Sequence, residues 1–310
     1  MTEARTIGTR DMKLLYAPLL SLKPEEDDLL KAFIAKGWNV HRWESARKAI
    51  DFNPDLVYVH AGSIANNELQ WVKNSTDALW TQWTGDCRDD LLEPVMMGKR
   101  IYDLTFLATA GGQGRKYQRA LKHPVYRLEH AVADWQFKEV RNDVERIVFV
   151  GNNYTHLRGG KEREEINKFL SFQLDDFAVY GNGWNSGYYS HAGILPFEET
   201  PFMYNSAIAG LGHNNYQNIR GYHSNRPLGI LAAGTVLLMR KFKGIKDYFQ
   251  DGENCLVYKT KEEALDLIKE LKSNPARRME LAAKGQLLAS MDHTYIFRVL
   301  EYEKIIKEYI

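Results

Sequence analysis

The chain alternates short apolar runs with longer stretches of helical spacing, a pattern typical of sheets covered by helices. Residues 12–20 and 55–60 are apolar enough to be buried strands, whereas residues 25–35 repeat apolar positions at the spacing of a helix. Further strands are expected at 38–43, 78–83, 104–108 and 124–127, and another helix begins near 68–73. Because parallel strands need helical crossovers between them, we expect a mainly parallel sheet with helices on both faces.

The same alternation begins again after a polar, aperiodic stretch near residues 134–142. Residues 146–150 predict the first strand of a second unit, whose other strands are expected at 176–180, 208–211, 236–239 and 255–258. Helices are expected at 161–172, 200–206 and 224–233, and three more, at 262–272, 275–290 and 294–310, form a helical C-terminus. We therefore expect an α/β protein of two Rossmann-like domains, residues 1–140 and 141–310, with parallel sheets facing a central cleft.

Composition excludes several classes of protein. Hydrophobic residues make up 44% of the 310 positions, yet no uninterrupted apolar run approaches the ~18 residues that span a bilayer. Lys and Arg number 41 against 40 Asp and Glu, so the net charge of +1 gives no overall attraction to a nucleic acid or an anionic membrane. Cys87 and Cys255 are too few for a disulfide framework, and the polar N-terminus carries no signal segment. We expect a soluble, cytoplasmic protein without a membrane span.

Polar loops at the ends of the expected strands are the candidate sites, because ligands of open α/β sheets bind beyond the carboxyl ends of the strands. The loop 151–161 contains Gly151, Asn152 and Arg158 between a strand and a helix. Backbone N–H groups at a helix N-terminus favour an anion, and Arg158 adds charge-assisted bonds, so a diphosphate fits this loop. A solvated turn, whose glycines serve only its backbone conformation, explains the same residues.

Gly181 and Asn182 follow the next strand of the second unit. Their small size lets the backbone approach a flat nucleobase, and we predict that both residues bind a donor. An ordinary Asn-Gly turn, followed by Trp184 as a core side chain, accounts for the same pattern.

Ser224, Asn225 and Arg226 open another expected helix. Ser224 or Asn225 can cap this helix, whereas a cation in its first turn opposes the helix dipole unless an anion compensates it. We interpret Arg226 as a phosphate clamp, and an ion pair with a nearby carboxylate is the alternative.

In the first half, Asp86 ends an expected strand where the cleft would lie. It can act as a general base toward an acceptor hydroxyl or hold the acceptor by a hydrogen bond, and an acid that only caps a turn is the alternative. His60 and His130 are weaker candidates, because an isolated histidine is more often structural. The sequence contains no Asp-x-Asp triplet and no His/Cys cluster, so we expect neither a metal nor a cofactor.

A series of short motifs runs through residues 222–298. They are Ser224-Asn225-Arg226, Ala232-Ala233-Gly234, Gly244, Phe249, Glu262-Glu263, His293-Thr294-Tyr295 and Arg298. Together they resemble the group-1-like C-terminal domain of the CgeB-like, spore-maturation-type glycosyltransferases. The first half of the chain matches that family only in architecture.

The resemblance implies a GT-B fold, in which the second domain holds most of a nucleotide-sugar donor and the first holds the acceptor. We accordingly expect a glycosyltransferase that uses a UDP-sugar and acts on a glycan, a protein, a small molecule or modified DNA. Arg158, Arg226 and backbone N–H groups would stabilise the departing diphosphate without a metal, assisted by Ser224 and Asn225. Asp86 would take the acceptor proton if the reaction inverts the anomeric centre.

The sequence departs from the wider group-1 pattern at two acids. In that group a Glu five residues before the equivalent of Gly234 binds the donor ribose, and Gly229 occupies that position here; Gly221 replaces a second acid near the transferred sugar. Two other functions therefore stay open: a non-catalytic nucleotide-sugar or glycan-binding module, and a GT-B glycosyltransferase acting on modified DNA. A basic strip that favours the latter comprises Arg115, Lys116, Arg119 and Lys122.

Overall fold

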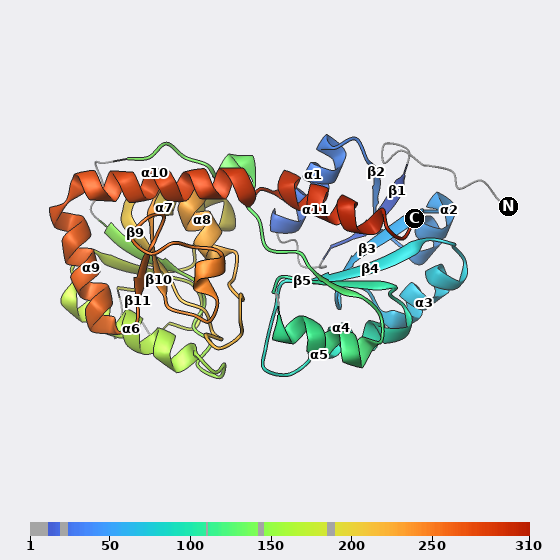
Figure 1. Cartoon of the computed structure of the whole chain (residues 1–310), viewed down its shortest axis with the longest axis horizontal. Coiled ribbons are helices and arrows are strands. Elements are labelled where there is room, and N and C mark those ends of the chain that lie inside the picture. The colour runs from blue at the N-terminus through green and yellow to red at the C-terminus, as the bar shows by residue number, and fades with distance from the viewer. Residues whose placement is uncertain (1–11, 19–23, 110, 142–145, 185–189) are drawn as a thin grey trace. The chain divides into compact units, whose positions relative to one another are not determined.

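The computed structural model describes residues 12–18, 24–109, 111–141, 146–184 and 190–310. The chain divides into two compact α/β units (Figure 1), one formed by residues 1–129 and 295–310 and the other by residues 130–294. The expected boundary near residue 140 differs from this division by about ten residues, and the last helix belongs to the first unit rather than the second.

The first unit is built on a six-stranded parallel sheet of order β2-β1-β3-β4-β5-β6. Its strands are β1 (Lys13–Ala17), β2 (Asn39–Arg42), β3 (Leu56–His60), β4 (Leu79–Thr84), β5 (Leu104–Leu107) and β6 (Val125–Arg127). All six were expected close to these positions, and the parallel sheet is confirmed.

Six α-helices accompany this sheet in the described residues. They are α1 (Pro24–Ala35), α2 (Ala46–Phe52), α3 (Asn66–Asn74), α4 (Glu93–Met97), α5 (Gly112–Leu121) and α11 (Tyr295–Ile306), with a 3-10 turn at Gly98–Arg100. Sequence periodicity misses α2 and α4 because each is too short to repeat an apolar face. In α2 the decisive signal is a cap, since the side chain of Ser45 accepts the amide of Lys48.

The C-terminal helix α11 completes the core of the first unit. Val299, Tyr302 and Ile306 are fully buried in the same apolar cluster as Phe33 and Tyr58. The Tyr302 ring lies 5.7 Å from that of Phe33 and 5.5 Å from that of Tyr58. Burial of this apolar face explains why the end of the chain joins the first unit.

The second unit contains a five-stranded parallel sheet of order β11-β10-β9-β7-β8. Its strands are β7 (Arg146–Val150), β8 (Phe177–Tyr180), β9 (Ala207–Gly212), β10 (Val236–Arg240) and β11 (Leu256–Tyr258). Its helices are α6 (Gly160–Gln173), α7 (Thr200–Asn205), α8 (Arg226–Ala232), α9 (Lys261–Ser273) and α10 (Pro275–Asp292), with 3-10 turns at Asp134–Gln136, Phe197–Glu199 and Ile245–Asp247.

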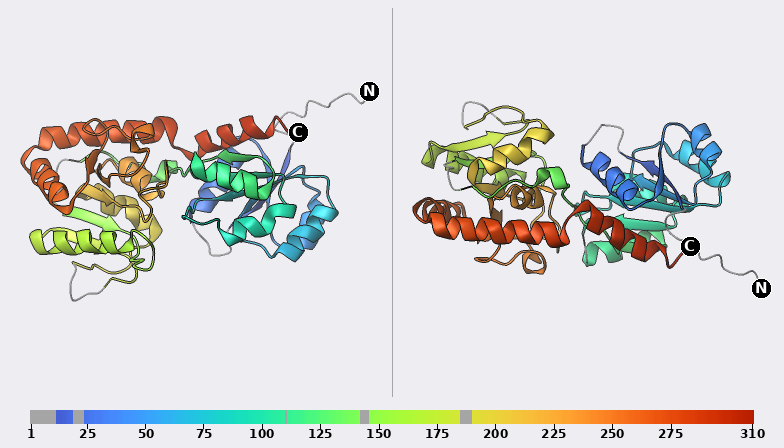
Figure 2. Two further views of the ribbon diagram at one scale, coloured as in Figure 1. Left: turned by 60° about the horizontal axis from the view of Figure 1, so that its bottom comes forward. Right: turned by 90° about the horizontal axis from the view of Figure 1, so that it is seen from above.

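Helices cover both faces of this second sheet (Figure 2). Side chains of β7 alternate between two apolar clusters: Ile147 and Phe149 join α6 and α9, whereas Val148 joins α7 and α8. Because β8 lies on one side of β7 and β9 on the other, the connections leaving β7 and β9 diverge. Such a topological switch point opens a crevice at the carboxyl ends of the two strands, where ligands of these folds bind.

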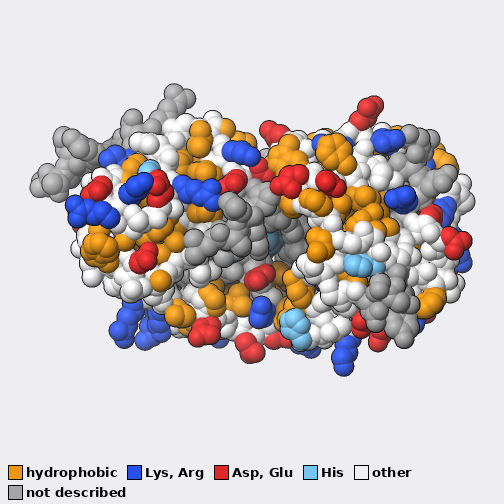
Figure 3. Space-filling view, turned by 180° about the vertical axis from the view of Figure 1, so that it is seen from behind, with side chains coloured by type: hydrophobic (Ala, Val, Ile, Leu, Met, Phe, Trp, Pro, Cys, Tyr) orange, Lys and Arg blue, Asp and Glu red, His pale blue; other side chains and the backbone are white. Residues whose placement is uncertain are grey.

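The surface carries charges of both signs. On the face drawn in Figure 3, acidic and basic side chains are interspersed among hydrophobic ones, as expected for a net charge of +1. Within the described parts of the chain, no helix is long and apolar enough to cross a membrane.

Candidate functional site

Arg226 lies across the switch point of the second sheet. It is the first residue of α8, and its half-buried side chain reaches the ends of two strands. Its Nε donates to the carbonyl of Val150, at the end of β7, over 2.5 Å, and its Nη1 donates to the carbonyl of His213, just beyond β9, over 3.2 Å. The guanidinium also lies 4.9 Å from the ring of Phe149. Arg226 therefore links the two diverging strands.

A second arginine, Arg163 of α6, makes the same link from the opposite side. Its Nη2 donates to the carbonyl of His213 over 2.8 Å and its Nη1 to the carbonyl of Asn152 over 3.1 Å. Only 3% of the residue is exposed. We call Arg163 and Arg226 the arginine pair, because both donate to one carbonyl oxygen.

The arginine pair is an uncompensated pair of cations. Burial, and then the charge of Arg226, lower the pKa of Arg163 to about 9, and burial lowers the pKa of Arg226. Both groups still carry their charge at neutral pH. Their hydrogen-bond acceptors are backbone carbonyls, and no carboxylate of the described residues forms an ion pair with either one. An anion at the switch point would relieve the repulsion.

Two glycines let the strand-end loops approach the arginine pair. A Cβ on Gly151 would lie 2.3 Å from Nη2 of Arg226, so any side chain there would displace the guanidinium. A Cβ on Gly181 would lie 2.4 Å from the carbonyl oxygen of Gly151. The amide of Asn182 donates to Oδ1 of Asn152 over 2.9 Å and holds the two loops together. The structure thus brings together Gly151, Asn152, Gly181, Asn182 and Arg226.

The remaining donor-binding residues predicted from the sequence are Arg158, Ser224 and Asn225, and they differ in exposure. Arg158 is exposed on the loop between β7 and α6. The amide of Ser224 donates to Oδ1 of Asn214 over 3.4 Å, and its buried hydroxyl has no hydrogen-bond partner among the described residues. Asn225 is the N-cap residue of α8, where its carbonyl accepts the amide of Gly229 over 3.1 Å. Ser224 and Asn225 therefore lie beside the arginine pair, whereas Arg158 faces solvent.

Trp184 is a core side chain, as the alternative interpretation of its loop expected. It is 7% exposed and belongs to the apolar cluster beneath α6 and α9, where its ring meets that of Phe149 edge-on at 5.6 Å. Its Nε1 donates to the carbonyl of Gly151 over 2.8 Å. This hydrogen bond also holds the loop that follows β7.

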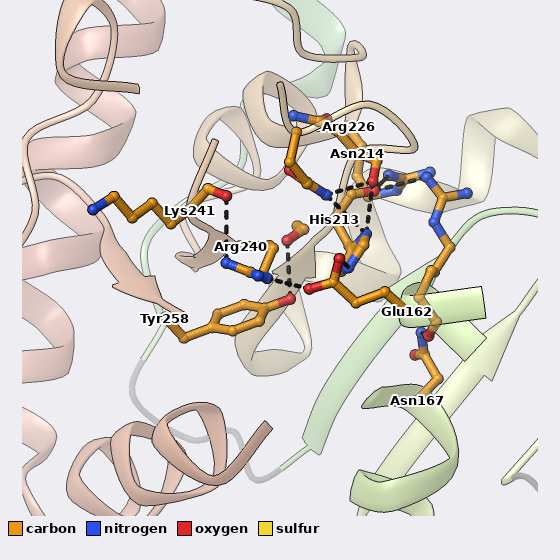
Figure 4. A network of polar contacts seen from close by, with 11 residues as sticks. Glu162, Asn167, His213, Asn214, Arg226, Arg240, Lys241 and Tyr258 are labelled. Carbon is orange, nitrogen blue, oxygen red and sulfur yellow. Dashed lines mark hydrogen bonds and ion pairs between the residues drawn. The ribbon is translucent and has the colours of Figure 1, made fainter. Parts of the chain in front are cut away.

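A polar network adjoins the arginine pair (Figure 4). His213 contributes its carbonyl to both arginines, and its ring points toward Glu162 of α6. Glu162 in turn accepts a hydrogen bond of 2.6 Å from Nε of Arg240, at the end of β10. Burial, and then the charge of Arg163, lower the pKa of His213 well below the usual range, so the imidazole is neutral. Neither Arg163 nor this network was selected from the sequence.

In the first unit, Asp86 follows β4 and is exposed, as expected for a strand-end acid. Its amide donates to Oγ1 of Thr84 over 3.3 Å. The adjacent Cys87 is buried, and burial, followed by the charge of Asp86, raises the pKa of this thiol to about 12, so it is not a nucleophile at neutral pH. His60, at the end of β3, meets the ring of Trp83 edge-on at 5.1 Å. His130 belongs to the second unit.

Comparison with known proteins starts from the sequence. Residues 160–304 match the model of a family described as glycosyl transferase-like, so the chain carries a glycosyl transferase-like domain there. This finding supports the broader class and leaves the CgeB-like assignment a prediction. No curated protein matches the sequence.

Solved structures resemble nearly the whole chain. Sucrose-phosphate synthase from Thermosynechococcus elongatus has a TM-score of 0.68 at 12% identity, over 96% of this chain and 98% of its own. Anabaena HepE, solved with UDP-glucose, has a TM-score of 0.66 at 10% identity, over 96% of this chain and all of its own. The fold is GT-B. TarM of S. aureus, solved with UDP and Fondaparinux, resembles 84% of this chain at a TM-score of 0.62 and 9% identity, over 57% of its own length.

Proposed function

We propose that the chain is a glycosyltransferase that moves a sugar from a nucleotide-diphosphate sugar to an acceptor hydroxyl. The glycosyl transferase-like domain and the GT-B fold support this reaction class. The observation that carries it is the arginine pair, two cations that pair with no carboxylate of the described residues and lie at the switch point where this fold binds ligands. A UDP-sugar is the expected donor, in keeping with the UDP-glucose bound to HepE.

The arginine pair would hold the diphosphate and stabilise the charge that grows on it as the bond to the sugar breaks. Fixed donors in a partly buried site are worth more than the same donors in water, because they need no reorganisation during the reaction. Asn152, Ser224 and the amides of the strand-end loops would supply further hydrogen bonds. Arg158 can add a cation from the solvent side once the donor is bound.

The reaction we propose needs no divalent metal. The described residues contain no group of three or more His, Cys, Asp or Glu side chains that could hold an ion. Metal independence is a prediction. Transfer rates measured with EDTA and with added Mg²⁺ or Mn²⁺ test it.

Asp86 would act on the acceptor. Its exposed carboxylate at the carboxyl end of β4 can accept a proton from a hydroxyl in an inverting reaction, or orient that hydroxyl in a retaining one. Asp86→Asn keeps the shape and removes the base. It should abolish inverting transfer and only weaken retaining transfer.

Thermal-shift measurements with UDP, GDP, dTDP and their sugars test the donor site. A ligand at 100 times its dissociation constant stabilises the fold by about 2.7 kcal/mol, which is readily detected. A shift with one nucleotide, followed by transfer of its sugar to some acceptor, supports the proposal. A shift without transfer or hydrolysis favours a nucleotide-sugar-binding module, and no shift with any nucleotide rejects the donor site.

One observation favours modified DNA as the acceptor. The basic strip of Arg115, Lys116, Arg119 and Lys122 is exposed on α5 and around its C-terminal end. The salt dependence of DNA binding tests this candidate. The logarithm of the binding constant falls linearly with the logarithm of the salt concentration, and each neutralised phosphate adds about 0.9 to that slope. Binding too weak to measure at low salt excludes DNA.

A further inference from the structure

A cavity of about 260 Å³ opens at the carboxyl ends of β9, β10 and β11. It lies between the N-terminal turns of α6 and α9, and one of its walls is the imidazole of His213. The backbone of the same residue accepts hydrogen bonds from both members of the arginine pair. The cavity therefore adjoins the diphosphate site of the proposed function, and no role has been assigned to it.

His213 directs a hydrogen-bond acceptor into this cavity. Its Nδ1 lies 2.7 Å from the carbonyl of Asn214 and must donate to it, so Nε2 of the neutral ring carries a lone pair. The side chain is fully buried. Among the described residues, Nε2 has no hydrogen-bond partner. Burying an acceptor without a donor costs free energy, so a ligand that donates a hydrogen bond to Nε2 would stabilise the site.

Glu162 presents a second acceptor to the same point. One carboxylate oxygen accepts from Arg240 over 2.6 Å, and the other lies 4.0 Å from Nε2 of His213 (Figure 4). Because His213 is neutral, this contact is not an ion pair. Two acceptors facing each other in this way select a ligand that carries hydroxyl hydrogens.

The charges around the cavity argue against an ionic ligand. Its lining includes three carboxylates and three cations: Glu162, Glu165, Glu262, Arg240, Lys259 and Lys261. These charges balance, so neither an anion nor a cation gains net attraction. The volume lies below the ~300–1,000 Å³ typical of sites for drug-sized molecules. A neutral, compact, polyhydroxylated ligand fits both the size and the polarity.

We infer that this cavity binds the sugar ring of the donor, with Glu162 and His213 accepting hydrogen bonds from its hydroxyl groups. The inference rests on the proposed function, because the shared residue His213 joins the cavity to the diphosphate site. Glu162 and His213 then select the sugar, and the arginine pair binds the diphosphate common to all donors.

Calorimetric titration with bare nucleotides and with their sugar conjugates tests the inference. The probes are UDP, GDP and dTDP and their glucose, galactose and N-acetylglucosamine conjugates. We expect Glu162→Gln to leave the dissociation constant of the bare nucleotide nearly unchanged and to weaken the preferred conjugate by about tenfold or more, as for loss of a hydrogen bond to a charged group. His213→Phe, which keeps a ring and removes the acceptor, should act in the same direction.

Asp176→Asn is the matched control. Asp176 pairs with Lys272 over 2.6 Å at the opposite end of the second sheet, so this variant also breaks a partly exposed ion pair of the same unit. It should leave both dissociation constants unchanged. If His213→Phe does not fold, Glu162→Gln still decides the matter.

The outcomes separate the two proposals. If no nucleotide binds, the proposed function fails and the sugar site fails with it. If the bare nucleotide binds but no conjugate binds more tightly, or Glu162→Gln weakens nucleotide and conjugate equally, the donor site stands and the sugar site is overturned. Nitrogen-15 NMR of His213 gives an independent reading: the Nε2 signal should move with the conjugate and stay in place with the nucleotide alone.

Discussion

Replacing Arg226 by alanine should cost both stability and turnover. The variant loses two hydrogen bonds from a charged donor, at about 1.5 kcal/mol each, and a ring contact worth roughly 0.5–1 kcal/mol. Relief of the repulsion with Arg163 offsets part of this gross loss. We therefore expect the free energy of unfolding, measured by urea titration of tryptophan fluorescence, to fall by about 2 kcal/mol.

Turnover should fall further than stability does. Removing one fixed donor that stabilises a leaving group typically lowers kcat by about 10²–10³-fold, and we expect Arg226→Ala to show a loss of that size in sugar transfer. Arg226→Lys keeps the charge, but one ammonium cannot reach the carbonyls of both Val150 and His213, so it should recover little turnover. A folded Arg226→Ala protein that transfers sugar at the wild-type rate would refute the role of the arginine pair.

Arg158→Ala is the companion variant. Because Arg158 is exposed, its loss should leave unfolding unchanged while reducing donor turnover, if the loop residue reaches the diphosphate. Unchanged turnover would remove Arg158 from the site and leave the arginine pair as its cationic part.

Three further predictions address the surroundings of the site and the core. Gly151→Ala should destabilise the second unit and weaken nucleotide binding, because the new Cβ would lie 2.3 Å from Nη2 of Arg226; calorimetry with UDP measures the binding loss, and unchanged affinity would contradict it. The lowered pKa of His213 means that the unfolded chain takes up its proton first, so stability should fall as the pH drops below the ordinary value of about 6.5. Denaturant titrations from pH 7.5 to 5.5 should therefore show a steeper loss for wild type than for His213→Phe, and equal slopes would count against burial of a neutral ring. Tyr302→Ala should lower the free energy of unfolding of the first unit by about 3–5 kcal/mol, since it empties a fully buried site, and a loss under about 1 kcal/mol would show that α11 is loosely docked.

Most strands were predictable because they are short apolar runs, such as β3 and β7. Both parallel sheets follow from that signal, as does the position of Gly151 and Gly181 at strand ends, and Arg226 was expected in the first turn of a helix. Short helices such as α2 and α4 were not predictable from periodicity, since five to seven residues cannot repeat an apolar face. The helix α5 begins at Gly112 and also contains Gly114, although glycine has a low helix propensity. Packing of Tyr117 and Leu121 in an apolar cluster outweighs that cost.

Arg163 was missed although the sequence carries a signal for it. The buried face of α6 runs through Arg163, Ile166, Asn167 and Leu170, which places two polar residues on an apolar stripe. Polar side chains in such positions must find partners inside the fold, and those of Arg163 are carbonyls at the strand ends. The role of His213 was not accessible in this way, because it depends on a backbone carbonyl whose direction only the folded chain defines.

Because α11 belongs to the first unit, that unit can be completed only after the second unit has been translated. A ribosome completes residues 24–129 long before it reaches Val299, Tyr302 and Ile306, so the apolar surface around Phe33 and Tyr58 stays uncovered while the whole second unit is translated. The second unit, which is continuous in sequence, can fold as it emerges. The first unit stays incomplete until α11 has been translated, and a chaperone that shields exposed apolar surface would act on it during that interval.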